Sequence, residues 1–265
     1  MKSGTPVACL LAIALIAMLP VVAGAEGVNC TGPSVLVPDG RITLSTIPTA
    51  TNYYWIIFVQ AGRSYSVETR FHKEVYNSSG PTMTLYANNA GGCDGTSTVA
   101  FTDTQTFEPK QTAFAGNSSG HRVSFTATDT WYWVKVNNAT GGTEEYTITA
   151  SDTTQFSPAW STISSYDTYY SFYNTTNSTC NVVLTLVDTG GTLRTTFNGA
   201  VTTGTTLSTN TNALGTARGM AGTAKLTLDC PPGGILAEAA IANFSISPTP
   251  YFQFIHFQPT RESAH

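Results

Sequence analysis

The chain has 265 residues, of which 41% are hydrophobic and only 11% charged, and its formal net charge at pH 7 is −4. A negative balance without a basic cluster excludes the usual kinds of nucleic-acid-binding protein. Few charges among many β-branched and turn-forming residues favour an all-β protein over a helical one.

The N-terminal segment, residues 1–25, has the layout of a secretory signal peptide. Lys2 precedes the apolar run VACLLAIALIAMLPVVA, and Ala23-Gly24-Ala25 follows as a small-residue cleavage site. Pro20 interrupts the run and no basic stop-transfer cluster follows it, which favours cleavage over a membrane anchor. Because no later segment has the roughly 20 consecutive apolar residues of a membrane helix, we expect a secreted, extracellular chain without membrane insertion.

The first half contains six stretches that alternate or run apolar, as β-strands do, with turn-rich segments between them. In chain order they are YYWIIFVQAG (53–62), SYSVETRF (64–71), TMTLYA (82–87), RVSFTAT (122–128), WYWVKV (131–136) and EYTITA (145–150). None has a sustained helical period. This half is therefore predicted to be an antiparallel β-sandwich.

The second half repeats this style of pattern. Its predicted strands are YYSFYN (169–174), NVVLTLVD (181–188), TLRTTFNG (192–199), TTLSTN (205–210), AKLTLD (224–229), AIANFSIS (240–247) and YFQFIHFQP (251–259). The stretch GILAEAAIANF (234–244) has the composition of a short helix as well, and we interpret it as a strand. If the closing strand lies unpaired at a sheet edge, it could add to the sheet of a neighbouring molecule.

The domain boundary is predicted within SDTTQFSPAW (151–160), where a strand pattern ends and Pro158 interrupts any continuation. The first domain then spans residues 26–153 and the second residues 157–265. We therefore expect two tandem antiparallel β-sandwich domains after a cleaved signal peptide.

Signal cleavage leaves four cysteines, an even number that indicates two disulfides in an exported chain. Three pairings are open, and the predicted boundary favours Cys30–Cys93 and Cys180–Cys230. A zinc site is the alternative, but no Cys-x-x-Cys or neighbouring histidine pair supports it.

The first half resembles the bacterial pre-peptidase C-terminal domain, a β-sandwich attached to many secreted bacterial enzymes and surface proteins. The residues that carry the resemblance are Trp55, Ile57, Val59, Ala61-Gly62, Tyr65, Val67, Leu85-Tyr86, Tyr132, Val134, Val136, Tyr146 and Ile148. These are core and turn positions, and the match covers about half of the mature chain. The second half resembles a generic bacterial immunoglobulin-like module.

The resemblance implies which side of each aromatic strand is buried. It puts the alternate residues Tyr132, Val134 and Val136 in the core, so that Trp131, Trp133 and Lys135 point outward. It likewise puts Trp55, Ile57 and Val59 inside, and leaves Tyr54, Ile56 and Phe58 on the other face. An outward cluster of aromatic residues usually marks an interface.

No catalytic constellation holds in this sequence, and the histidines at 72, 121, 256 and 265 are isolated from one another. Carboxylates for glycoside hydrolysis could come from Glu68, Glu74, Glu108, Glu144 or Glu145. We expect no enzyme, with an unrecognised secreted hydrolase as an alternative. We also expect no cofactor, although calcium could bind the loop aspartates Asp94, Asp103 or Asp129.

The outward tryptophans are the best functional lead. Aromatic rings on a sheet face can stack on sugar rings or contact a protein, so we expect a ligand site at Trp131, Trp133, Lys135 and Tyr54. The resulting hypothesis is a non-catalytic module at the cell surface or in the extracellular matrix that binds a polysaccharide or a surface protein. Two alternatives stay open: these rings pack against the second domain, or the chain self-associates as a structural subunit of an extracellular assembly.

Overall fold

The computed structural model describes residues 32–71, 82–87, 99–102, 105–107, 120–138, 142–246 and 249–259, and the structural statements below concern these ranges. Their regular structure consists of strands in stacked sheets, which confirms the predicted all-β sandwich fold. No apolar helix of membrane-spanning length occurs among them. The predicted signal peptide lies outside the described residues, as do Cys30, Cys93, Asp94 and Asp103.

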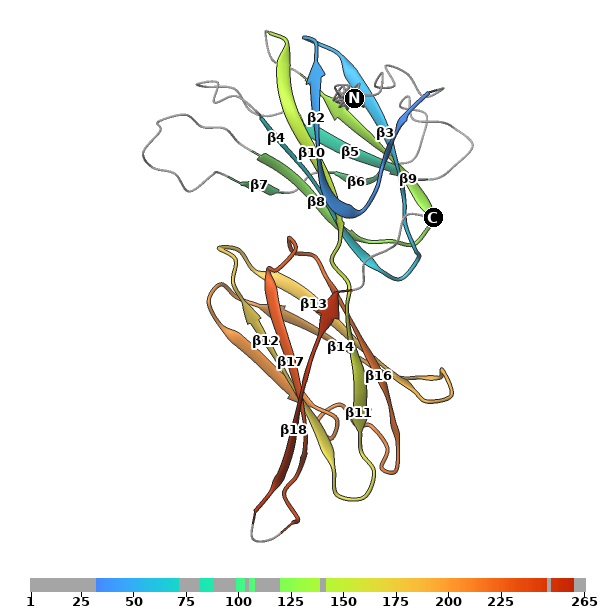
Figure 1. The fold of residues 1–265 in the computed structure, drawn as a ribbon, viewed down its shortest axis with the longest axis vertical. Helices are drawn as coiled ribbons and strands as arrows, with labels where there is room; N and C mark the ends of the chain where they lie inside the picture. The colour runs from blue at the N-terminus through green and yellow to red at the C-terminus, as the bar shows by residue number, and fades with distance from the viewer. Residues whose placement is uncertain are drawn as a thin grey trace, which may run out of the picture.

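The first sandwich is formed by two five-stranded sheets (Figure 1). Sheet I has the order β1 (Ser34–Leu36), β3 (Asn52–Phe58), β9 (Trp131–Asn137), β5 (Thr82–Ala87) and β6 (Val99–Thr102). Sheet II has the order β2 (Asp39–Ile47), β10 (Glu144–Asp152), β4 (Ser64–Phe71), β8 (Gly120–Thr126) and β7 (Gln105–Phe107). Neighbouring strands are antiparallel, except that β1 and β3 are parallel.

The second sandwich is formed by a five-stranded and a four-stranded sheet. Sheet III has the order β14 (Leu193–Val201), β13 (Cys180–Asp188), β16 (Ala221–Leu228), β11 (Gln155–Ser161) and β19 (Gln258–Pro259). Sheet IV has the order β15 (Thr206–Asn210), β12 (Asp167–Asn174), β17 (Ile235–Asn243) and β18 (Tyr251–His256). All described pairs in these two sheets are antiparallel.

Alternation along the strands builds each core. In β10, for example, Tyr146, Ile148 and Ala150 are fully buried while the residues between them face outward. The indole N–H of Trp55 in sheet I donates to the Tyr146 hydroxyl in sheet II at 3.2 Å. This hydrogen bond joins the polar groups of two buried rings across the sandwich.

Trp160 of β11 is buried in the second core, where its indole N–H contacts two neighbouring strands. Its indole N–H lies 3.0 Å from the carbonyl oxygen of Val187 and 3.1 Å from that of Thr223. Gly222 is the cross-strand partner of Trp160 in β16. A Cβ atom added at Gly222 would lie 1.9 Å from the Val187 oxygen, so this close approach of two strands requires glycine.

Two strand predictions in the second half have clear outcomes. Residues 234–244 were ambiguous between helix and strand, and β17 confirms the strand. Pro158 was expected to interrupt any continuing strand pattern, and the pairing of β11 with β16 is irregular at this residue although the strand itself continues. This proline lies inside β11, at a register shift between Ser157 and Trp160, where a residue without an N–H is tolerated.

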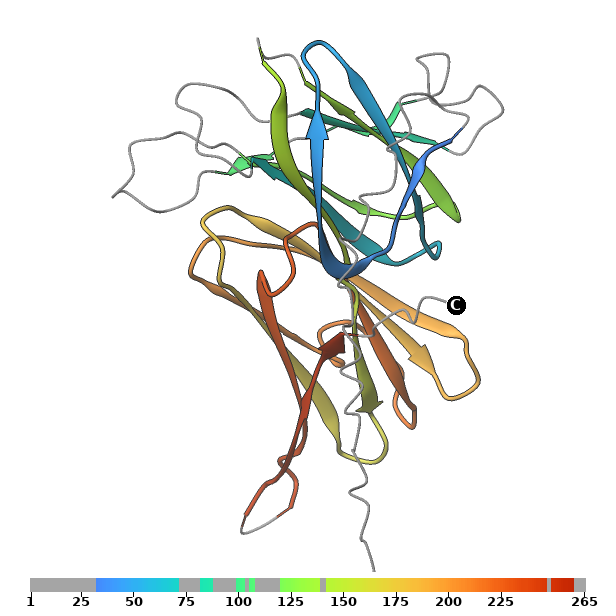
Figure 2. The same cartoon turned by 45° about the horizontal axis from the view of Figure 1, so that its top comes forward.

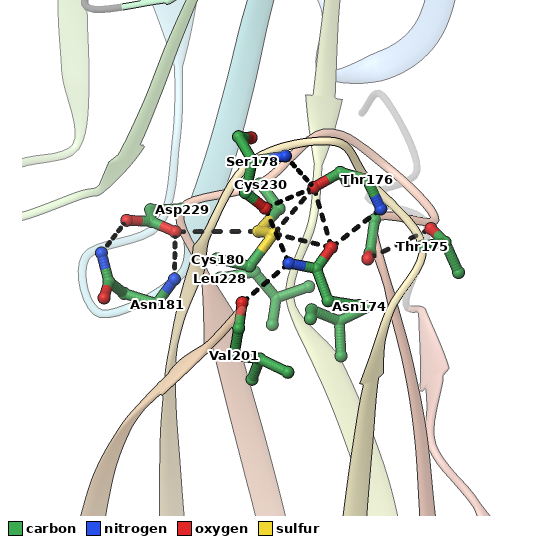
Figure 3. The surroundings of a disulfide bond; sticks show 12 residues. Asn174, Thr175, Thr176, Ser178, Cys180, Asn181, Val201, Leu228, Asp229 and Cys230 are labelled. Atoms are coloured by element: carbon green, nitrogen blue, oxygen red, sulfur yellow. Dashed lines mark hydrogen bonds between the residues drawn. A yellow bond between two sulfur atoms is a disulfide. The ribbon is translucent and has the colours of Figure 1, made fainter. Parts of the chain in front are cut away.

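The predicted disulfide between Cys180 and Cys230 is confirmed, and both residues are buried (Figure 3). Beside it, the buried Asn174 side chain donates to the carbonyl oxygens of Ser178 and Val201, each at 2.7 Å. The Asn174 amide thus joins the β12–β13 connection to the end of β14, and the disulfide joins β13 to the segment that follows β16.

The two sandwiches are joined end to end, with β10 continuing into β11 (Figures 1 and 2). Arg63 Nη1 lies 2.7 Å from Asp152 Oδ2, and its guanidinium stands 5.4 Å from the centre of the Phe156 ring in β11. Lys225 Nζ donates to the carbonyl oxygen of Gly62 at 2.8 Å. Burial of this ammonium, and next the nearby Arg63, lower the pKa of Lys225. A set of polar contacts therefore connects the sandwiches.

Candidate binding faces

The outward side of β9 and β3 forms the face that the sequence singled out, here called the tryptophan face and defined by Trp131, Trp133, Lys135, Tyr54, Ile56 and Phe58. β9 buries Tyr132, Val134 and Val136 to within 1% of full burial and leaves its other residues partly exposed. The orientation implied for this strand is therefore confirmed. β3 follows the same alternation, with Ile57 buried and Phe58 53% exposed.

The two indoles are perpendicular to each other. The ring centroids of Trp131 and Trp133 are 5.4 Å apart and the interplanar angle is 84°. Across the strand pair, Trp131 stands opposite Phe58 and Trp133 opposite Ile56. Because the two planes are perpendicular, a flat ligand ring can stack on one indole at a time and not on both.

Tyr54 does not belong to the open part of this face. It points outward as expected, opposite Lys135, but only 7% of it is exposed. Tyr86 of β5, opposite Trp133 on the same side of the sheet, is also buried. The prediction that Tyr54 is available to a ligand is therefore wrong, because its side chain is buried, and the exposed part of the face lies at the end with Phe58.

Polar side chains occupy the other end of the same face. Lys135 is partly exposed on β9, followed two residues later by Asn137. The Asn137 side chain donates to the side-chain oxygen of Asn52 on β3 at 2.7 Å. The tryptophan face therefore passes from an aromatic end to a polar end over the length of one strand.

The contacts that join the sandwiches do not use the tryptophan face. Within the described ranges, the hydrogen bonds, ion pairs and ring contacts between them come from the turn before β4 and its first residue, namely Gly62, Arg63 and Ser64. Trp131 and Trp133 make their one ring contact with each other. The alternative that these rings pack against the second sandwich thus finds no such contact in this part of the chain.

The candidate ligands and catalytic groups are spread over the first sandwich. Asp129 accepts the backbone N–H of Thr130 at 2.7 Å, as turn aspartates do. Glu68 pairs with Arg122 at 3.3 Å and with Arg70 at 3.2 Å. Among the described residues no three His, Cys, Asp or Glu side chains gather as metal ligands would. The calcium and hydrolase alternatives remain untested predictions, and Glu74 and Glu108 lie outside the described residues.

A second face emerges only from the structure. The outward side of sheet IV, here called the phenylalanine face, carries large side chains that are 37–70% exposed: Tyr169, Tyr173, Leu236, Phe252 and Phe254. An edge-to-face chain runs from Tyr169 through Phe244 to Phe252, with centroids 5.8 and 5.3 Å apart. A groove of about 200 Å³ lies on this sheet, lined among others by Tyr169, Ser171, Glu238 and Phe254.

The sequence contained part of the signal for the phenylalanine face. The alternation of YFQFIHFQP predicted a closing strand, and β18 with β19 confirms it. What the pattern does not specify is that the apolar side of β18 faces solvent. Ile255 is buried, whereas Phe254, its neighbour on the same edge strand of sheet IV, is 70% exposed.

Comparison with known proteins gives little. No protein-family profile matches the chain, and no curated protein matches it. The full extracellular region of zebrafish Gpr126/Adgrg6 aligns with 89% of this chain and 34% of its own length, at 9% identity and a TM-score of 0.25. A glycosyl hydrolase family 2 member from Bacteroides cellulosilyticus aligns with 77% of this chain and 26% of its own, at 8% identity and a TM-score of 0.20.

A Bacteroides uniformis beta-glucuronidase aligns with 80% of this chain and 26% of its own length, at 13% identity and a TM-score of 0.20. The chain thus spans about a third or less of these solved structures. Likeness at this level supports no statement about function, and the resemblance to pre-peptidase C-terminal domains stays a prediction.

Proposed function

We propose that the protein is a secreted, non-catalytic binding protein that recognises a polysaccharide or a surface protein through the tryptophan face. One observation carries the proposal: β9 turns Trp131 and Trp133 away from the core, and Phe58 beside them is more than half exposed. Exposed aromatic rings provide large contact areas at a low cost in side-chain entropy.

The composition of the face favours a carbohydrate among these ligands. Sugars combine apolar ring faces with hydroxyl groups, so their sites pair an aromatic ring with hydrogen-bonding side chains. The Phe58–Trp131 end offers the ring, and Lys135, about 13 Å further along β9, and Asn137 beyond it offer polar groups within reach of later sugars of a polysaccharide chain. Because the indoles are perpendicular, the proposed site holds one sugar ring on one indole.

Secretion is part of the same proposal. The N-terminal sequence has the layout of an export signal. The disulfide between Cys180 and Cys230 is of the kind that persists in oxidising compartments. Both observations support a location outside the cytosol.

Affinity electrophoresis tests the ligand class. The mature protein is run in gels cast with individual neutral and acidic polysaccharides, beside Trp131→Ala, Trp133→Ala and the control Tyr173→Ala, which removes an exposed ring from the other sandwich. We expect Trp131→Ala, which removes the stacking ring, to lose retardation and Trp133→Ala, which removes the edge contact that orients that ring, to weaken it, while both melting temperatures stay close to that of the parent. Lower melting temperatures with unchanged retardation would assign the indoles to packing and contradict the proposal.

A further inference from the structure

The C-terminal strand β18 is an open edge of sheet IV. Among the described strands it pairs with β17 alone. Its hairpin with β17 extends away from the first sandwich to the far end of the molecule (Figures 1 and 2). The backbone groups on its other side therefore have no strand partner in the described part of the chain.

The direction of those groups follows from one hydrogen bond. Phe257 donates its N–H to the carbonyl oxygen of Ala237 at 3.4 Å, so residue 257 faces β17. In an antiparallel ladder the residues alternate between facing the partner strand and facing away from it. Phe252, Phe254 and His256 thus present their N–H and C=O groups at the open edge, and their side chains lie on the phenylalanine face.

This edge lacks the features that normally prevent strand addition. Proline, charged side chains, short length and bulges protect edge strands. In the same sandwich β19 has two residues and contains Pro259, β15 has five residues and is polar, and β14 carries Arg194. β18 has six residues with no proline, lysine, arginine or carboxylate among them. Among the four described edge strands of this sandwich, β18 is therefore the one that lacks these protective features.

We propose that β18 pairs antiparallel with β18 of a second copy of this chain, which joins two four-stranded sheets into one of eight strands. A two-fold contact brings identical surfaces together, so it requires a strip without like charges. β18 meets this condition, because His256 is its one ionisable group besides the Tyr251 phenol. This inference concerns a different surface from the tryptophan face and does not depend on the proposed function.

The ends of the open edge determine the register. Pro250 precedes the strand and has no N–H to donate. At the other end Phe257 turns into the core, 8% exposed, and the chain crosses to sheet III as β19. Between these limits the three residues that face the open edge, Phe252, Phe254 and His256, are centred on Phe254. Full overlap of two such segments places Phe254 opposite its own copy and Phe252 opposite His256.

The apolar strip then continues across the two-fold axis. Phe254 is the most exposed large apolar side chain in the described ranges, at 70%, and Phe252 is 49% exposed. An interface formed by one strand pair and these rings buries little area compared with specific, stable interfaces, which bury about 1,200 Å² or more in total. The dimer is therefore expected to dissociate on dilution.

Sedimentation velocity over a wide range of concentration tests the association. We expect the mature chain to pass from monomer to dimer as concentration rises, and Phe254→Lys to remain monomeric throughout. Leu193→Lys is the matched control, because Leu193 is 59% exposed on the edge strand of sheet III. A parent protein that stays monomeric, or a dimer that survives Phe254→Lys, overturns the proposal.

Disulfide trapping tests the register and does not depend on how the lysine variant folds. Directly opposed residues of a hydrogen-bonded pair have Cα atoms about 5.5 Å apart, within the range of about 4.4–6.8 Å that a disulfide spans. Under mild oxidation Phe254→Cys is expected to give a covalent dimer through residue 254, identified by peptide mass. Phe252→Cys is expected to give none, since its two copies lie on the order of 14 Å apart. Equal cross-linking by both variants contradicts the pairing.

Discussion

Arg63 and Asp152 form an ion pair where the two sandwiches meet, with Arg63 Nη1 2.7 Å from Asp152 Oδ2. The carboxylate side chain is 2% exposed and the guanidinium side chain 18%. Loss of one partner leaves the other charge buried without compensation, which typically costs about 3–5 kcal/mol. The pair also positions the guanidinium beside Phe156, the second residue of β11.

Arg63→Met is therefore expected to lower the free energy of unfolding by about 3 kcal/mol, measured by urea denaturation. The matched control is Arg41→Met, because Arg41 pairs with Asp39 at 3.6 Å while 80% exposed. An exposed pair of this kind contributes about 0–1 kcal/mol. Equal losses in the two variants would show that the Arg63 pair has no special part in holding the junction.

The disulfide is expected to contribute strongly to the stability of the second sandwich. It closes a loop with a sequence separation of 50 residues. Loop-closure entropy assigns such a link about 4 kcal/mol of stabilisation. The double variant Cys180→Ala/Cys230→Ala should therefore unfold at a clearly lower urea concentration than the oxidised parent. Reduction of the parent should reproduce most of that shift, and a variant as stable as the oxidised parent would refute the estimate.

The close approach of β13 and β16 makes Gly222 irreplaceable. A methyl group at this position would meet the Val187 carbonyl oxygen at 1.9 Å and the Cα of Asp188 at 2.6 Å, both backbone atoms that cannot turn aside. Overpacking of this kind costs about 1–3 kcal/mol or more. Gly222→Ala should thus lower the melting temperature. Gly32→Ala, with no atom within 4 Å of the added carbon, is the control and should leave it unchanged.

Alternation divides β9 into two sides, and the side that the resemblance to pre-peptidase C-terminal domains put in the core, with Tyr132, Val134 and Val136, is the buried one. The same reasoning fails for β2, where Ile42 and Leu44 are 69% and 49% exposed while Ser45 is buried. There the apolar residues of the pattern face solvent, and the strand was not predicted. The pattern of one strand describes its two sides and does not determine which side another part of the chain covers.

The same limit explains the two candidate faces. The outward position of Tyr54 could be predicted from its parity with Ile56 and Phe58, but its burial depends on tertiary neighbours. The strand β18 could be predicted from its alternation, but its place at a sheet edge follows from the order of strands in sheet IV. Strand order depends on how the whole sandwich packs, so it cannot be predicted from the sequence of one strand.

Asp188 gives the β13–β14 hairpin a dependence on pH. Its carboxylate accepts the backbone N–H groups of Thr192 and Gly190 at 2.8 and 2.9 Å and pairs with Arg194. The hydrogen bond from Thr192, and next the one from Arg194, lower the pKa of Asp188 below its ordinary value of 3.8. The folded state therefore binds this proton less readily than the unfolded state.

A depressed folded-state pKa means that this carboxylate stabilises the protein fully above its unfolded pKa, near pH 4, and that the stabilisation disappears as the pH falls through the folded value. The melting temperature of the parent should thus decline below pH 4. Asp188→Asn, which cannot ionise, should start lower at neutral pH and decline less over the same acidic range. If the melting temperatures of parent and variant fall by the same amount from pH 7 to pH 2, Asp188 does not contribute to the acid sensitivity.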